Sequence, residues 1–316
     1  MRAIRTIAER EFRALITAPL GYVVILFFLL VSAVFFVAPL QRGLAHMRMV
    51  VGNTTIWLVF LLPAITMRLL AEEKKQGSIE ILMTSPVTET QVVLGKYLGA
   101  LGYYLVMLFS TFQFVFALAW VRKSQVSAFF PTYVGLILVA VTLVLLALAA
   151  LRESRVLGLV TAVSAVSTLI CVGFAMHQMG EWGPALTGYI GLLLIGATFL
   201  AIGLMTSALT RNQIIAWVST AAILLGLTVL IGWMAEQLPG QLPVKEANAD
   251  VGATLKFAVN MVVYGLVQVL KALSLQEYLQ NFAMGVLDLR DLVLYLSLIA
   301  ASLFFAVRGL TTSRWT

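Results

Sequence analysis

The sequence predicts an all-α protein, a polytopic transmembrane bundle of about eight spans. Of the 316 residues, 61% are apolar and 11% are charged, whereas a soluble domain has roughly 45–50% apolar and about 25% charged residues. The apolar residues form continuous runs without the alternation of a β-barrel strand, and about 20 of them cross a hydrocarbon core as a helix. A backbone in lipid must satisfy its own hydrogen bonds, so each run is expected to be helical.

Eight segments have the length and hydropathy of a span. They are residues 20–40, 54–71, 92–120, 131–150, 156–176, 185–208, 213–234 and 291–308. A ninth apolar segment, 251–273, is too short for a full crossing because only fourteen residues separate Lys256 from Lys271. We expect a re-entrant or interfacial helix there.

The Lys and Arg residues are distributed unevenly between the two sides of the predicted bundle. With the N-terminus inside, thirteen lie on the cytoplasmic side and four in short external loops; four more lie in one long external segment. Cytoplasmic loops carry the excess of Lys and Arg, so we expect both termini in the cytoplasm. This excess also accounts for the net charge of +7, and no basic cluster with interleaved aromatic residues indicates nucleic-acid binding.

An amphipathic helix is predicted at residues 2–18, before the first span. Its apolar side chains share one face at helical spacing, and most of its charged residues lie off that face. The apolar set is Ile4, Ile7, Ala8, Phe12, Leu15 and Ile16. Pro19 ends the pattern, and we expect the helix to lie along the inner surface of the membrane.

The longest cytoplasmic connection, Thr66–Lys96, contains two helix breaks. Gly77 can adopt the left-handed conformation that ends a helix, and Ser78 can cap a new one. Pro86 disfavours helical backbone at the residue before it, so the new helix has about two turns. Glu80 lies in its first turn, where the helix dipole favours an acidic side chain.

One face of this short helix is apolar, with Ile79, Leu82 and Met83. Apolar side chains on a small cytoplasmic helix need a covering surface. Spacing alone leaves two alternatives open, a partner protein or the lipid headgroups.

The third span begins with two local signals. Thr88 and Gln91 have the spacing of a capping box. Gly95 and Gly99 are spaced for a close contact between helices. Gly95-Lys96 is not a nucleotide-binding P-loop, because the sequence lacks the first glycine and the final Ser or Thr of that motif.

Four blocks of sequence carry a family resemblance. They are PAITMRLLAEEKKQGSIEILMTSPV at Pro63–Val87, LGKYLGA at Leu94–Ala100, GYIGLLLIGATFLAIGLMTSALTRNQIIA at Gly188–Ala216 and QNFAMGVLDLRDLVLYLSL at Gln280–Leu298. In this order they resemble the membrane subunit of ABC type-2 exporters, in the branch of the permeases associated with gliding motility and with nitrous oxide reductase maturation. The first block, lying between two spans, is the most specific.

The resemblance implies a permease subunit of an ABC transporter, not itself an enzyme, in a bacterial inner membrane. ATP and Mg²⁺ would bind a separate ABC ATPase subunit, so no cofactor is expected in this chain. The helix Ser78–Ser85 would couple to that ATPase, and the N-terminal helix would lie at the same interface. The implied coupling residues are Glu72, Glu73, Gly77, Ser78, Ile79, Glu80, Leu82, Met83 and Pro86. Further expected partners are a second permease copy or a homologue, an exported auxiliary protein and the lipid bilayer.

Such permeases usually have six spans, so two helices are expected as an insertion. The resulting division is a connecting helix at 1–19, spans at 20–120, the inserted pair at 121–181, and spans at 182–316 with an external re-entrant segment at 235–290. The role of the insertion stays open between lipid-facing support and a partner surface.

Two other functional classes are less well supported by the sequence. An ion-coupled secondary transporter usually buries Asp or Glu at mid-membrane, whereas all fourteen acids here lie at span ends, in loops or in terminal helices. A membrane enzyme would need a cluster of polar residues at one interface. His46, His177 and Cys171 do not have the spacing of metal ligands.

Overall fold

The computed structural model describes residues 2–41, 47–77, 87–112, 114, 141, 163–170, 182–237, 259–265, 267–269, 272 and 274–312. The elements assigned within these ranges are all helical. They are α1 (Arg2–Thr17), α2 (Pro19–Gln41), α3 (Met47–Thr66), α4 (Ala71–Gln76), α6 (Glu89–Ser110), α10 (Trp182–Leu209), α11 (Gln213–Leu225), the π-helical turn η2 (Gly226–Leu230), α12 (Ile231–Gln237), α14 (Leu275–Ala283) and α15 (Leu289–Thr312).

The predicted fold class is confirmed, because the described part of the chain contains five helical segments long and apolar enough to cross a membrane. They are Val51–Gln76, Glu89–Ser110, Gly183–Leu209, Gln213–Met234 and Leu289–Thr311. A sixth is counted if α1 and the start of α2, which meet at a bend of 67°, form one broken span. The predicted pair at 131–150 and 156–176 lies outside the described residues, except for 141 and 163–170.

Helix α6 covers the first part of the third predicted span, 92–120, whose residues 113 and 115–120 lie outside the described part of the chain. Helix α6 ends at Ser110, where the Ser110 hydroxyl donates to the Met107 carbonyl at 2.5 Å and the Thr111 hydroxyl donates to the Leu108 carbonyl at 2.6 Å. Side-chain hydroxyls that bond nearby carbonyls compete with the regular helical pattern. The backbone turns at Thr111, and residues 112 and 114 are again helical.

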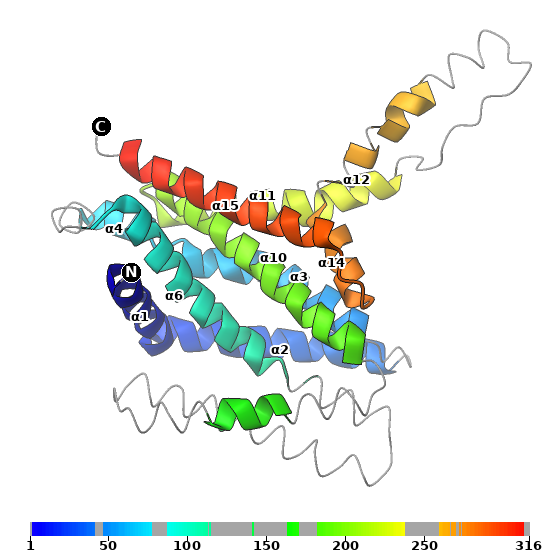
Figure 1. Ribbon diagram of the computed structural model, residues 1–316, viewed down its shortest axis with the longest axis horizontal. Coiled ribbons are helices and arrows are strands. Elements are labelled where there is room, and N and C mark those ends of the chain that lie inside the picture. The colour runs from blue at the N-terminus through cyan, green and yellow to red at the C-terminus, as the bar shows by residue number, and fades with distance from the viewer. Residues whose placement is uncertain are drawn as a thin grey trace, which may run out of the picture.

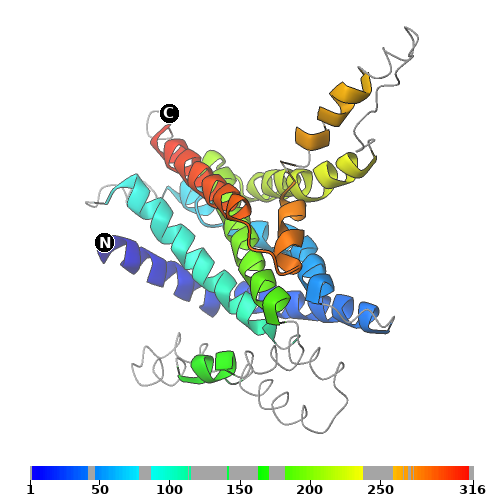
Figure 2. The same ribbon diagram turned by 45° about the vertical axis from the view of Figure 1, so that its right-hand side comes forward.

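Helix α10 is at the centre of the bundle and contacts α3, α6, α11, α14 and α15 (Figures 1 and 2). Small residues let its neighbours approach closely. A Cβ built on Gly196 would lie 2.2 Å from the ring of Tyr104, whose hydroxyl donates to the Leu192 carbonyl at 2.5 Å. The close packing of α6 against α10 therefore depends on the absence of a side chain at Gly196.

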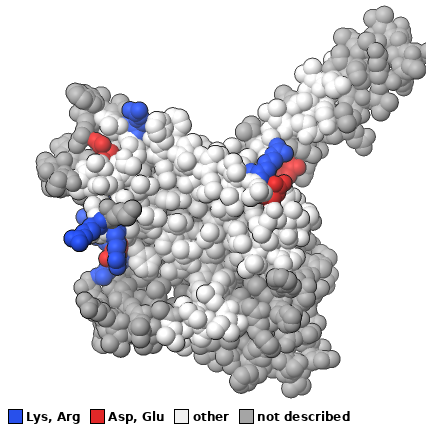
Figure 3. Space-filling view, in the orientation of Figure 1, with Lys and Arg blue, Asp and Glu red and all other residues white. Residues whose placement is uncertain are grey.

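The start of α1 and the end of α15 lie at the same end of the bundle as α4, on the left of Figure 1, and α14 lies toward the opposite end. On the face drawn in Figure 3 the charged side chains gather toward these two ends, with uncharged surface between them. An uncharged band between charged ends suits a helical bundle surrounded by lipid.

Candidate functional site

Helix α1 packs against the glycine residues near the start of α6. A Cβ built on Gly95 would lie 2.7 Å from the side chain of Ile7, and one built on Gly99 would lie 2.7 Å from the Cβ of Glu11. The predicted close helix contact at Gly95 and Gly99 is therefore confirmed, and its partner is α1. Ile7, on the apolar face of α1, therefore contacts protein, where hydropathy alone suggested lipid.

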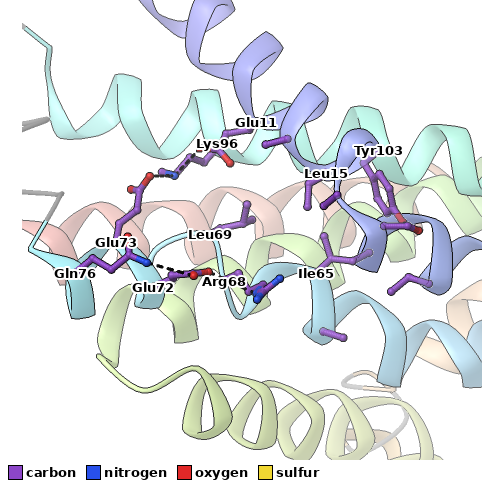
Figure 4. A pocket seen from close by; sticks show the side chains of 15 residues that line it. Glu11, Leu15, Ile65, Arg68, Leu69, Glu72, Glu73, Gln76, Lys96 and Tyr103 are labelled. Carbon is purple, nitrogen blue, oxygen red and sulfur yellow. Dashed lines mark hydrogen bonds and ion pairs between the residues drawn. The ribbon is translucent and has the colours of Figure 1, made fainter. Parts of the chain in front are cut away.

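A buried lysine joins α1, α4 and α6. The side chain of Lys96 is 1% exposed, and its Nζ lies 2.8 Å from Oε1 of Glu11 and 2.8 Å from Oε1 of Glu73. Figure 4 shows Lys96 between these two carboxylates. The guanidinium of Arg10 lies 3.5 Å from Glu11 and 3.6 Å from Glu73. Two cations and two anions thus balance one another, as a buried charge requires.

A hollow of about 280 Å³ opens beside this cluster (Figure 4). Its apolar walls include Leu15, Ile65 and Leu69. At its charged side, Arg68 Nε lies 3.5 Å from Glu72 Oε2, and Gln76 Nε2 donates to the other carboxylate oxygen of Glu72 at 3.3 Å. Glu72, with 34% of its side chain exposed, is more accessible to a partner than Glu73, with 22%.

The helix end and the helix start predicted on either side of residues 78–86 are both confirmed. Gly77 has φ +69° and caps α4 in the left-handed conformation, which glycine adopts without steric cost. Thr88 and Gln91 form the capping box of α6, because the Thr88 hydroxyl accepts the Gln91 N–H at 3.3 Å and the Gln91 side chain accepts the Thr88 N–H at 3.2 Å. The described chain therefore stops before residue 78 at a defined helix end and resumes after residue 86 at a defined helix start.

Three of the nine predicted coupling residues, Glu72, Glu73 and Gly77, lie in the described part of the chain. The other six fall in residues 78–86, which lie outside it. Sequence reasoning missed Lys96, Glu11 and Arg10. A lone Lys inside the apolar third span was the available signal, because a lysine buried in a helical bundle needs an acidic partner.

A metal centre has no candidate among the residues whose positions are described. No three His, Cys, Asp or Glu side chains there are grouped closely enough to hold an ion.

The fold and this cluster define a polytopic α-helical membrane protein whose N-terminal helix is tied by charge to its second and third spans. Residues 40–154 match the family model of the ABC-2 family transporter protein. That stretch is less than half of the chain, and it contains α3, α4 and α6 with Glu73 and Lys96. No curated protein sequence matches the chain.

Proposed function

We propose that this chain is the membrane-spanning permease subunit of an ABC exporter, driven by a separate ATPase subunit in a bacterial inner membrane. The observation that carries the proposal is the charged cluster of Lys96, Glu11 and Glu73 at the base of the connection 78–86. The match to the ABC-2 transporter model spans this same connection and supports the proposal. The asymmetry of Lys and Arg supports placing the connection in the cytoplasm.

A segment that receives force from a partner must be held firmly by the protein it acts on. The cluster holds both sides of the connection, since Glu73 lies just before it and Lys96 lies in α6, just after it. Glu11 adds α1 to the same anchor. In this proposal Glu73 braces the docking segment, and the more exposed Glu72 is available to the ATPase.

The test replaces the apolar face predicted for residues 78–85. The variant Ile79→Ser, Leu82→Ser, Met83→Ser is expressed with an affinity tag and purified from its native membrane. A co-purifying ATPase is recognised by mass spectrometry from a Walker A motif and by ATP hydrolysis. Each side chain that the partner fully buries contributes roughly 1.5–3 kcal/mol, so the variant is expected to insert normally and to lose the ATPase.

A matched control replaces three exposed apolar residues away from α4. Val286, Leu287 and Leu289 are 54%, 56% and 79% exposed and lie between α14 and the start of α15. Their triple replacement by Ser is expected to keep the ATPase. The proposed function is wrong if the wild-type protein carries no ATPase, and the docking role of residues 78–85 is wrong if their variant retains it.

The proposal includes a second permease subunit, either another copy of this chain or a homologue, because each subunit would supply half of a pathway. The proposal also includes an exported auxiliary protein as a partner, which is what a resemblance to the gliding-motility-like branch implies. Native mass spectrometry of the purified complex counts the permease chains. An active complex with a single copy of this chain and no homologue would contradict the dimer.

An ion-coupled secondary transporter is the alternative function. Across the described ranges, each Asp and Glu lies in α1, α4, α12 or α14, in the loop before α15, or in the first turn of a spanning helix. No observation there favours coupling to an ion gradient. The alternative predicts transport that continues without ATP and stops when the gradient is collapsed.

A further inference from the structure

We infer that Ser207 and Lys74 tie helix α4 to the ends of α10 and α15, so that α4 passes movement of the ATPase-docking connection to this second half of the bundle. The inference rests on the proposed function and deepens it by assigning positioning residues.

The first tie, made by Ser207, lies where the second span is interrupted between α3 and α4. Helix α3 ends at Thr66 and α4 begins at Ala71, and the first N–H groups of a helix have no partner within it. The buried hydroxyl of Ser207 accepts the N–H of Leu70 at 3.2 Å and that of Ala71 at 3.0 Å. The same hydroxyl donates a hydrogen bond to the Met67 carbonyl at 3.3 Å.

No nearby side chain performs this role, because Leu70 stands at the N-cap position without a side-chain hydrogen bond. The start of α4 is therefore capped from α10, by a residue 136 positions further along the chain. An unsatisfied buried N–H is unfavourable, so α4 keeps its position against α10 as long as this hydroxyl is present.

The second tie lies one turn further along α4. The Lys74 ammonium donates to the carbonyl of Ala208, in the last turn of α10, and lies 3.4 Å from the carbonyl of Gly309, near the end of α15. The last carbonyls of a helix lack partners within it, and a cation there is favourable. Lys74 therefore bridges two helix ends that belong to the C-terminal half of the chain.

Close approach of the backbones makes these ties short. A Cβ built on Gly203 would lie 2.1 Å from the Thr66 hydroxyl, and one built on Gly309 would lie 3.0 Å from the side chain of Leu209. Both glycines leave the space that brings α3, α4 and α15 against α10.

The opposite side of α4 is held by the charged cluster, through Glu73 and Lys96. Successive residues of an α-helix point about 100° apart, so Glu73 and Lys74 reach different neighbours. One short helix thus connects α1 and α6 on one side with α10 and α15 on the other. Displacement of α4 must move both sets of helices or break the bonds to one of them.

The test follows nucleotide-dependent change in the complete complex. The permease is purified with its ATPase in lipid nanodiscs, and hydrogen–deuterium exchange is compared before and after trapping with ATP and vanadate. The ends of α10 and α15 and the start of α6 are expected to change exchange in the wild-type complex. The double variant Lys74→Met, Ser207→Ala is expected to lose the change at α10 and α15 and to keep it in α6.

Conservative variants separate positioning from general loss of structure. Ser207→Thr keeps a hydroxyl and Lys74→Arg keeps a cation. Each is made as a single change in the wild-type protein, and each is expected to keep the change in exchange at the ends of α10 and α15. If the double variant does not assemble, Lys74→Met alone is measured in the same way, because it leaves the cap by Ser207 intact.

The outcomes distinguish the inference from the function on which it rests. A wild-type permease without an ATPase overturns both. A wild-type complex that traps vanadate but shows no change at α10 and α15 overturns the inference alone. An undiminished response at these ends in the assembled double variant, or in Lys74→Met where the double variant does not assemble, overturns it as well.

Discussion

Replacing Lys96 by methionine tests whether the charged cluster holds α1 against the bundle. The change keeps most of the side-chain volume and removes a cation that is 1% exposed, leaving the carboxylates of Glu11 and Glu73 at 13% and 22% exposure. Removing one partner of a buried ion pair costs roughly 3–5 kcal/mol. Since both carboxylates retain some solvent contact and the guanidinium of Arg10, we expect about 3 kcal/mol.

Tryptic cleavage within α1 measures this loss. Trypsin cuts after the arginines of α1 only when the helix has opened, and the cleavage rate follows the population of the open form. A loss of about 3 kcal/mol corresponds to roughly a hundredfold larger open population. Lys96→Met is therefore expected to be cleaved in α1 up to about a hundred times faster than the wild type.

A triple variant is the matched control. Lys96→Met, Glu11→Gln, Glu73→Gln removes the cation and both anions together, and replacing a whole buried ion pair by neutral groups is often close to neutral. Its cleavage rate is expected to return to within about tenfold of the wild type. The reasoning is refuted if Lys96→Met is cleaved at the wild-type rate, or if the triple variant is cleaved as fast as the single one.

Three further predictions use the same protein. Gly99→Val is expected to cost about 1–3 kcal/mol by overpacking and to speed tryptic cleavage of α1, because a Cβ at Gly99 would lie 2.7 Å from the side chain of Glu11. Gly102→Ala should have a smaller effect on cleavage, because its Cβ would lie 3.1 Å from the ring of Phe12. Gly77→Ala is expected to lower the apparent melting temperature through a loss of about 1 kcal/mol, since its φ is +69°. Gly52→Ala, inside helix α3 with open space around the added atom, should not lower it. A fluorescent reporter fused after Thr316 is expected to be active in the cytoplasm, and a fusion active only outside the cell would contradict the predicted topology.

Local signals in the sequence were sufficient for the five spans found among the described residues and for the helix ends beside the connection. The end of α4 at Gly77 and the capping box of Thr88 and Gln91 depend on residues within a few positions of one another. Their conformational preferences act in any helix of this kind. Gly95 and Gly99 also predicted a close helix contact, without identifying the helix that makes it.

The candidate site could be predicted only in part. Glu73 was selected through the family resemblance, but its bond to Lys96 and the role of Glu11 were not, because 85 positions separate Glu11 from Lys96 along the chain. Hydropathy shows that a lysine lies near an apolar run, and it contains no information about which helix brings the acid that neutralises it.

The sequence by itself determined the helical class, the positions of the five spans found in the described part of the chain and the amphipathic nature of α1, because periodicity and hydropathy are local properties. Only the tertiary structure decided what the apolar face of α1 touches and what caps α4. Lipid and a glycine-rich helix surface are both apolar environments, so the hydropathy of Ile7 fits either one. The hydroxyl of Ser207 reaches Ala71 only because α3 and α10 pack at close range, a relation between distant segments that no local pattern specifies.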